Sequence, residues 1–174
     1  MASVSLARLM PPPSNPVETS GSWLHVEDAL GTQLPDDFKE FIRHYGSGKI
    51  NHFLLVLNPF SSRKRLNLLE QSKLQLDVLR ELRDEFGETN PYKLYPAIGG
   101  LLPVAITENG DVVHWLTNGS PEKWVIVVNE ARSPDYELFK CNLTEFLEAL
   151  MEKTIECRAF PKMIFDEKIE FSLT

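Results

Sequence analysis

The chain has 174 residues, of which 43% are hydrophobic and 25% are charged, a balance typical of a soluble globular domain with its own core. Its 25 acidic and 18 basic residues give a net charge of −7. That charge disfavours nucleic acid and anionic membranes as direct partners and is compatible with a basic protein partner, although an acidic surface also simply keeps a protein in solution. No apolar run approaches the ~20 residues of a membrane span, and Met1–Ser20 lacks the apolar core of a secretory signal, so we expect a cytoplasmic protein.

The first 20 residues contain prolines at positions 11, 12, 13 and 16 and predict an extended lead-in. Within it, Leu6, Leu9 and Met10 have the spacing of a single turn that docks onto the body of the protein. We expect residues 21–174 to form one domain.

Two short helices are predicted next, each ended by a glycine. The first runs from about Ser22 to Leu30, before Gly31. The second begins at Pro35, whose fixed φ suits the first helical position, and ends near Gly46. One face of this second helix is apolar, and its members are Phe38, Phe41, Ile42 and Tyr45.

Phe53–Leu57 is apolar throughout and predicts a strand that is covered on both faces. Leu66–Phe86 follows and reads as the longest helix, ended by Gly87. The chain then changes to the period of strands. Four strands joined by short turns are expected, at Leu102–Thr107, Val112–Leu116, Trp124–Asn129 and Tyr136–Cys141.

The third of these strands has no polar alternation, which favours a central place in the sheet. Asn142, with Glu145 three residues later, indicates the start of a last helix. Ile169–Leu173 alternates and predicts an edge strand. Because strands and helices are segregated along the chain, the expected fold class is α+β, with a largely antiparallel mixed sheet and helices packed around it.

Catalytic chemistry is not apparent in the sequence. The four histidines stand apart, without the spacing of metal ligands, and no nucleophile motif is present. Cys141 precedes a helix but reads as a small buried residue, whereas Cys157 follows a helix and is expected to be partly exposed. We therefore predict no enzyme activity, no cofactor and no catalytic or metal-binding residue.

Acidic residues flank two of the predicted turns. Glu108 and Asp111 stand on either side of Asn109-Gly110, a pair that favours a tight hairpin turn, and Glu130 and Asp135 flank the turn after the third strand. If these turns share one end of the sheet, the four carboxylates form an acidic rim that steers a basic protein partner. Against this, acidic residues are common in turns for purely local reasons.

The order of residues over most of the chain resembles the SUKH superfamily, the Smi–Knr family. The match begins with Trp23, Leu30-Gly31 and Leu34-Pro35-Asp36-Asp37, and continues through Tyr45-Gly46. The apolar strand before Asn58-Pro59 and the helix with Leu143-Thr144-Glu145-Phe146-Leu147 complete it. No single motif here is specific; the order and spacing of the whole set carry the resemblance.

This resemblance implies a sheet with helices packed around it and a non-catalytic binding function. Bacterial members are typically immunity proteins that bind and neutralise a cognate polymorphic toxin, often a nuclease. Fungal relatives link signalling to cell-wall synthesis and act as interaction scaffolds or regulators. For a compact acidic chain the implied partner is a basic toxin domain, with the scaffold function as the alternative.

Overall fold

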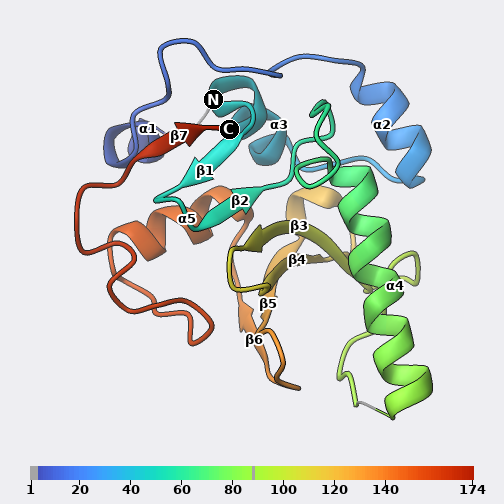
Figure 1. The fold of residues 1–174 in the computed structure, drawn as a ribbon. Coiled ribbons are helices and arrows are strands. Elements are labelled where there is room, and N and C mark those ends of the chain that lie inside the picture. Colours follow the sequence, from blue (N-terminus) through green and yellow to red (C-terminus); the bar gives the residue numbers. More distant parts are fainter. Residues whose placement is uncertain (1–3, 88) are drawn as a thin grey trace.

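A single antiparallel sheet of seven strands organises residues 4–87 and 89–174, which are the residues that the computed structural model describes (Figure 1). Its order is β6-β5-β4-β3-β2-β1-β7, and every neighbouring pair is antiparallel. The strands are β1 Gly48–Ile50, β2 Leu54–Val56, β3 Leu101–Thr107, β4 Val112–Leu116, β5 Val125–Asn129, β6 Tyr136–Phe139 and β7 Phe171–Leu173. The expected α+β class is confirmed.

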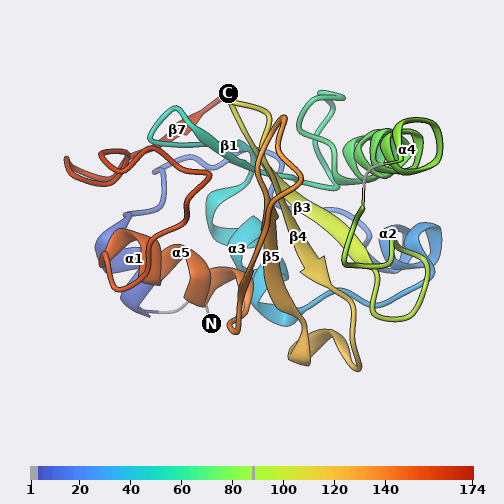
Figure 2. The ribbon, with the colours of Figure 1, turned by 90° about the horizontal axis from the view of Figure 1, so that it is seen from below.

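Helices cover both faces of this sheet. They are α1 Val4–Leu9, α2 Trp23–Leu30, α3 Asp36–Tyr45, α4 Leu68–Phe86 and α5 Leu143–Met151, with a short 3-10 helix at Pro121–Lys123. Figure 2 shows α1, α3 and α5 on one side of strands β3–β5, and α4 on the other. The central strands therefore have no free face, which explains why β2 and β3 are buried at every position.

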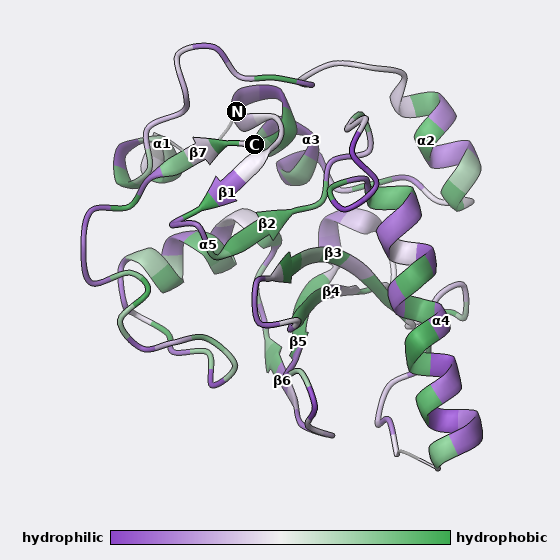
Figure 3. Cartoon of the chain, in the orientation of Figure 1, coloured by the Kyte–Doolittle hydropathy of each residue, from purple (hydrophilic) through white to green (hydrophobic). Residues whose placement is uncertain are grey.

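The larger core lies between the sheet and α3 and α5. Phe38 of α3 meets Trp115 of β4 edge to face, with ring centroids 5.0 Å apart. The helices are also tied to each other, because the backbone N–H of Thr144 donates to Asp37 Oδ2 at 3.0 Å. In Figure 3, β2–β5 are mainly hydrophobic, whereas hydrophobic and hydrophilic residues alternate along α4.

A smaller core lies on the opposite face, under α4. Leu76 of this helix packs with Leu101 and Val127 of the sheet, and Leu94 joins them from the loop after the helix. The burial of this second face corrects one expectation from the sequence, that the strand at Trp124–Asn129 has a central place in the sheet. β5 is apolar because both of its faces are covered, although it lies next to the edge strand β6 and not at the centre of the sheet.

Both termini of the described chain are held against the body. β7 pairs with β1 and forms one edge of the sheet, which confirms the edge strand expected at the end of the chain. At the other end, residues 4–9 are helical where an extended segment is expected, and the docking turn predicted within it is confirmed. Leu6 and Met10 are fully buried in the larger core, and Tyr45 Oη donates to the carbonyl of Met10 at 2.7 Å.

Hydrogen bonds to the Glu18 side chain hold the later part of the lead-in against the body of the protein. Its carboxylate accepts hydrogen bonds from Ser47 Oγ at 2.6 Å and from the backbone N–H of Ser62 at 2.8 Å. Burial alone would raise the pKa of Glu18, but these hydrogen bonds outweigh it and lower the pKa to about 2. The boundary at residue 20 stays a prediction, and residues 1–3 of the lead-in lie outside the described residues.

The docked helix α1 makes a first prediction. Leu6→Ala should lower the free energy of unfolding by about 2–5 kcal/mol, because it removes a fully buried side chain and leaves a cavity. Arg8→Ala on the same helix should change it by less than about 0.5 kcal/mol, because Arg8 is exposed. Urea unfolding of both variants measures this. Equal stability of the two variants would contradict the docking of α1.

Glu18 makes a second prediction, on pH. Its folded pKa of about 2 lies below the usual glutamate value of 4.5, so its contribution to stability is complete above pH 4.5 and is lost as the pH falls towards 2. Glu18→Gln should therefore destabilise the protein by on the order of 1 kcal/mol at pH 7, with the difference shrinking below pH 4. Urea unfolding at pH 7 and pH 3 measures it. A difference that stays constant with pH would contradict the assignment.

Candidate functional site

The two acidic turns predicted from the sequence lie at the same end of the sheet. Val112 at the start of β4 pairs with Asn129 at the end of β5, so the β3–β4 and β5–β6 turns are neighbours. Glu108, Asp111 and Glu130 line one surface hollow of about 430 Å³. Asp135 lines a smaller adjoining hollow together with Glu130. The structure thus brings all four predicted residues to one end of the sheet.

The four carboxylates differ in what they contact. Asp111 is only 2% exposed, and accepts from Thr107 Oγ1 at 2.6 Å and from the backbone N–H of Ala131 at 2.9 Å. Its side chain therefore holds the two turns together and offers little surface to a partner. Sequence spacing alone did not distinguish it from the exposed acids.

Glu108 is accessible but already paired. Lys49 Nζ and Arg65 Nη2 each lie 2.7 Å from its carboxylate oxygens, and the hydrogen bonds from Lys49 and Arg65 lower the pKa of Glu108. Glu130 and Asp135, in contrast, have no ion pair with any residue that the structure describes. Of the predicted rim, these two carry the negative charge that remains available to a partner.

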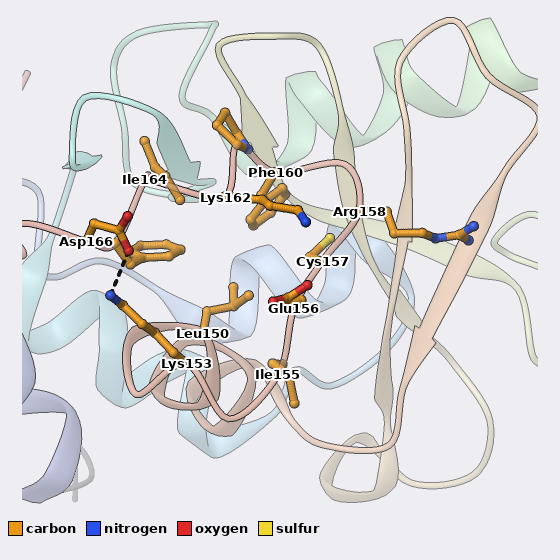
Figure 4. A pocket seen from close by; sticks show the side chains of 12 residues that line it. Leu150, Lys153, Ile155, Glu156, Cys157, Arg158, Phe160, Lys162, Ile164 and Asp166 are labelled. Carbon is orange, nitrogen blue, oxygen red and sulfur yellow. Dashed lines mark hydrogen bonds and ion pairs between the residues drawn. The ribbon is translucent and has the colours of Figure 1, made fainter.

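A larger hollow of about 460 Å³ lies in the segment after α5, and the sequence did not predict it (Figure 4). Its apolar lining comes from Leu150, Ile155, Phe160, Ile164 and Phe165, and its charged lining from Lys153, Glu156, Arg158, Lys162 and Asp166. The only signal in the sequence is the presence of bulky apolar residues among the charges of this tail. Residues 152–169 form no helix or strand, so neither periodicity places these side chains on one surface.

Long-range contacts give this irregular segment its shape. The ring of Phe160 packs against Phe53, with centroids 5.4 Å apart. Asn51, in the tight turn between β1 and β2, donates from Nδ2 to the carbonyl of Ile164 at 2.7 Å. A salt bridge of 2.6 Å joins Lys153 to Asp166 across the hollow. The hollow is thus a built feature of the fold, held from two sides.

The hollows at this end of the molecule share lining residues. Arg158 lines both the large hollow and the small one beside Asp135, and Ala159 lines the small one and the hollow at Glu108. Between them, Arg158 pairs with Glu137 of β6 at 3.5 Å. The acidic turns and the segment after α5 therefore lie side by side, and we call the surface that they form the turn-end surface.

Three groups with the potential for catalysis, His114, Cys157 and Cys141, are buried or half-buried. His114 is fully buried, its Nε2 lies 2.7 Å from Asn129 Oδ1, and burial lowers its pKa to about 4 in spite of the contact with Asn129. The cysteines reverse the exposure predicted for them. Cys157 is 6% exposed because Phe160 and its neighbours cover it, whereas Cys141 is half-buried.

Neither thiol is activated. Burial raises the pKa of Cys157 to about 12 and that of Cys141 to about 11, so both are protonated at neutral pH. Among the described residues, no three histidine, cysteine or acidic side chains gather as a metal site would require. Among the same described residues, no helix is both long enough and apolar enough to cross a membrane.

A sheet with helices packed around it is the arrangement that the resemblance to the SUKH superfamily implies. A model of the SMI1-KNR4 cell-wall family, SUKH_6, matches residues 21–147, about three quarters of the chain, and the chain belongs to this family. Comparison with curated proteins and with solved structures found no significant match. The large hollow is built mostly from residues after the matched region.

The role of Asp111 makes a third prediction. Asp111→Ala should lower the free energy of unfolding by about 1–3 kcal/mol, because it leaves Thr107 Oγ1 and the Ala131 N–H without their acceptor in a buried place. Asp135→Ala, in the exposed part of the next turn, should have an effect below about 0.5 kcal/mol. Chemical denaturation compares the two. A small effect of Asp111→Ala would show that the carboxylate does not hold the turns together.

Proposed function

We propose that this protein is a non-catalytic immunity protein, which binds a cognate toxin domain in the cytoplasm and neutralises it in a stoichiometric complex. The support is membership of the SMI1-KNR4 family together with the accessible carboxylates of Glu130 and Asp135 at the turn-end surface. The alternative is an interaction scaffold or regulator of the Smi–Knr type. The cell-wall description of the matched family favours keeping that alternative in view.

Electrostatics gives the proposal a physical basis. A nuclease toxin needs a basic surface to hold the phosphates of its substrate. A protein with a net charge of −7 approaches such a surface faster than a neutral one, and two unpaired carboxylates on a concave surface orient the encounter. Occupying the basic surface also excludes nucleic acid from it. The proposed partner is therefore a basic toxin protein, with no direct contact to nucleic acid or membrane.

A co-expression experiment tests the function. The C-terminal domain encoded by the neighbouring upstream gene is expressed with and without this chain, and growth and co-purification are scored. Rescue of growth together with a stable complex is the expected result. Toxicity that this chain does not relieve, or the absence of both toxicity and a complex, would contradict the immunity function and favour the scaffold.

A fourth prediction concerns the rate of association with that toxin domain. Reversing Glu130 and Asp135 to lysine should lower the association rate about tenfold at low salt, because it removes the attraction at the turn-end surface. The difference should shrink at about 1 M salt, where the Debye length is about 3 Å. Stopped-flow mixing measures the rates.

The matched control is Asp28→Lys/Glu81→Lys on helices α2 and α4, where both side chains are exposed. This variant has the same net charge as Glu130→Lys/Asp135→Lys. Similar slowing in the two variants would mean that net charge alone steers the partner. No slowing in either would remove the acidic turns from the binding surface.

A further inference from the structure

The hollow after α5 has the anatomy of a protein-binding hot spot. Its floor is apolar, and its charged groups stand around the edge. Pockets for small molecules instead aim a few buried polar groups at their ligand. None of the buried polar side-chain atoms that lack a partner among the described residues belongs to a residue of this lining. The volume of about 460 Å³ has room for a short segment of chain carrying a bulky side chain.

The charges at the edge indicate what stands beside that side chain. The lining has three cations and two carboxylates, and one of the cations, Arg158, is paired outside the lining. Lys153 is paired with Asp166 and Arg158 with Glu137. Lys162 and Glu156 have no ion pair with any described residue. Figure 4 shows Lys162 extending over the hollow, whereas Arg158 points away towards β6.

We propose that this hollow is a docking site for a segment of the partner protein that carries a bulky apolar side chain next to a carboxylate. The apolar side chain enters between Ile155, Phe160 and Ile164, and the carboxylate pairs with Lys162. Because Arg158 and Ala159 connect this hollow to the acidic turns, one partner contacts both. The acidic turns steer the encounter, and the buried apolar side chain supplies most of the affinity.

This inference rests on the proposed function for the identity of the partner, but its test does not. A library of random dodecapeptides displayed on phage is selected against the full chain. The expected result is enrichment of peptides in which an aromatic or leucine residue stands next to Asp or Glu. Synthetic copies of these peptides should shift the amide NMR signals of residues 155–166 in a saturable manner.

Two pairs of variants decide whether the hollow is responsible. Lys162→Glu should weaken peptide binding at least fivefold, whereas Lys168→Glu, an equal charge change in the same tail outside the lining, should not. Ile164→Glu should weaken it at least tenfold, whereas the neighbouring Met163→Glu should not, because Met163 is 76% exposed and outside the lining. Thermal unfolding confirms that each variant is folded. Because Lys162 is exposed, its variant keeps the test valid if Ile164→Glu does not fold.

Other outcomes would overturn the inference. One is that no peptide is enriched, and another is that the selected peptides bind the Lys162→Glu and Ile164→Glu variants as tightly as the unchanged chain. A third is the selection of basic peptides whose binding is lost only in the Glu130→Lys variant. The last result would still support the acidic turns as the binding surface. Conversely, failure of the co-expression experiment with a positive peptide result would reject the toxin as partner and keep the docking site.

Discussion

Burial of both faces of the sheet is the constraint on which the rest of the structure depends. Phe38 and Trp115 meet on one face, while Leu76 and Val127 pack on the other. Many antiparallel sheets keep one face open to water or to a partner, but the central strands here have none. The accessible surface is therefore made by the outer sides of the helices, the turns and the segment after α5. We propose that the partner binds at the turn end of the sheet, where two accessible carboxylates and a hollow lie side by side.

At that end, the same residue type has different roles. The carboxylate of Asp111 holds two turns together, and that of Glu108 is paired with Lys49 and Arg65. The carboxylates of Glu130 and Asp135 remain available to a partner. Beside them lies a hollow with an apolar floor and an unpaired lysine. Long-range attraction and short-range apolar burial are separate contributions to binding, since the first sets the association rate and the second the dissociation rate. Because the acidic turns and the apolar hollow lie side by side, one surface provides both contributions to binding.

Local signals account for the parts of the fold that the sequence predicts. The helical periodicity of Leu66–Phe86 predicts α4, and Asn142 with Glu145, which form the capping box of α5, predict the start of that helix. β1 is different, because Gly48–Ile50 pairs along its whole length with Phe171–Leu173, more than 100 residues away, and with β2 only at Ile50 and Leu54. The large hollow likewise depends on Asn51 holding Ile164, and Asp111 on the distant Ala131. Contacts between distant residues leave no periodic pattern in the sequence. Residue spacing therefore predicted where the acidic turns lie, but not the separate roles of their carboxylates.

The most direct test is hydrogen–deuterium exchange on this chain, free and in complex with the toxin domain obtained by co-expression. If the turn-end surface binds the partner, protection on complex formation should concentrate in residues 108–111, 130–135 and 155–166. Helix α4, on the face of the sheet opposite to α3 and α5, should exchange in the complex as it does in the free protein. Protection over α4 with no change at the three segments would contradict the account.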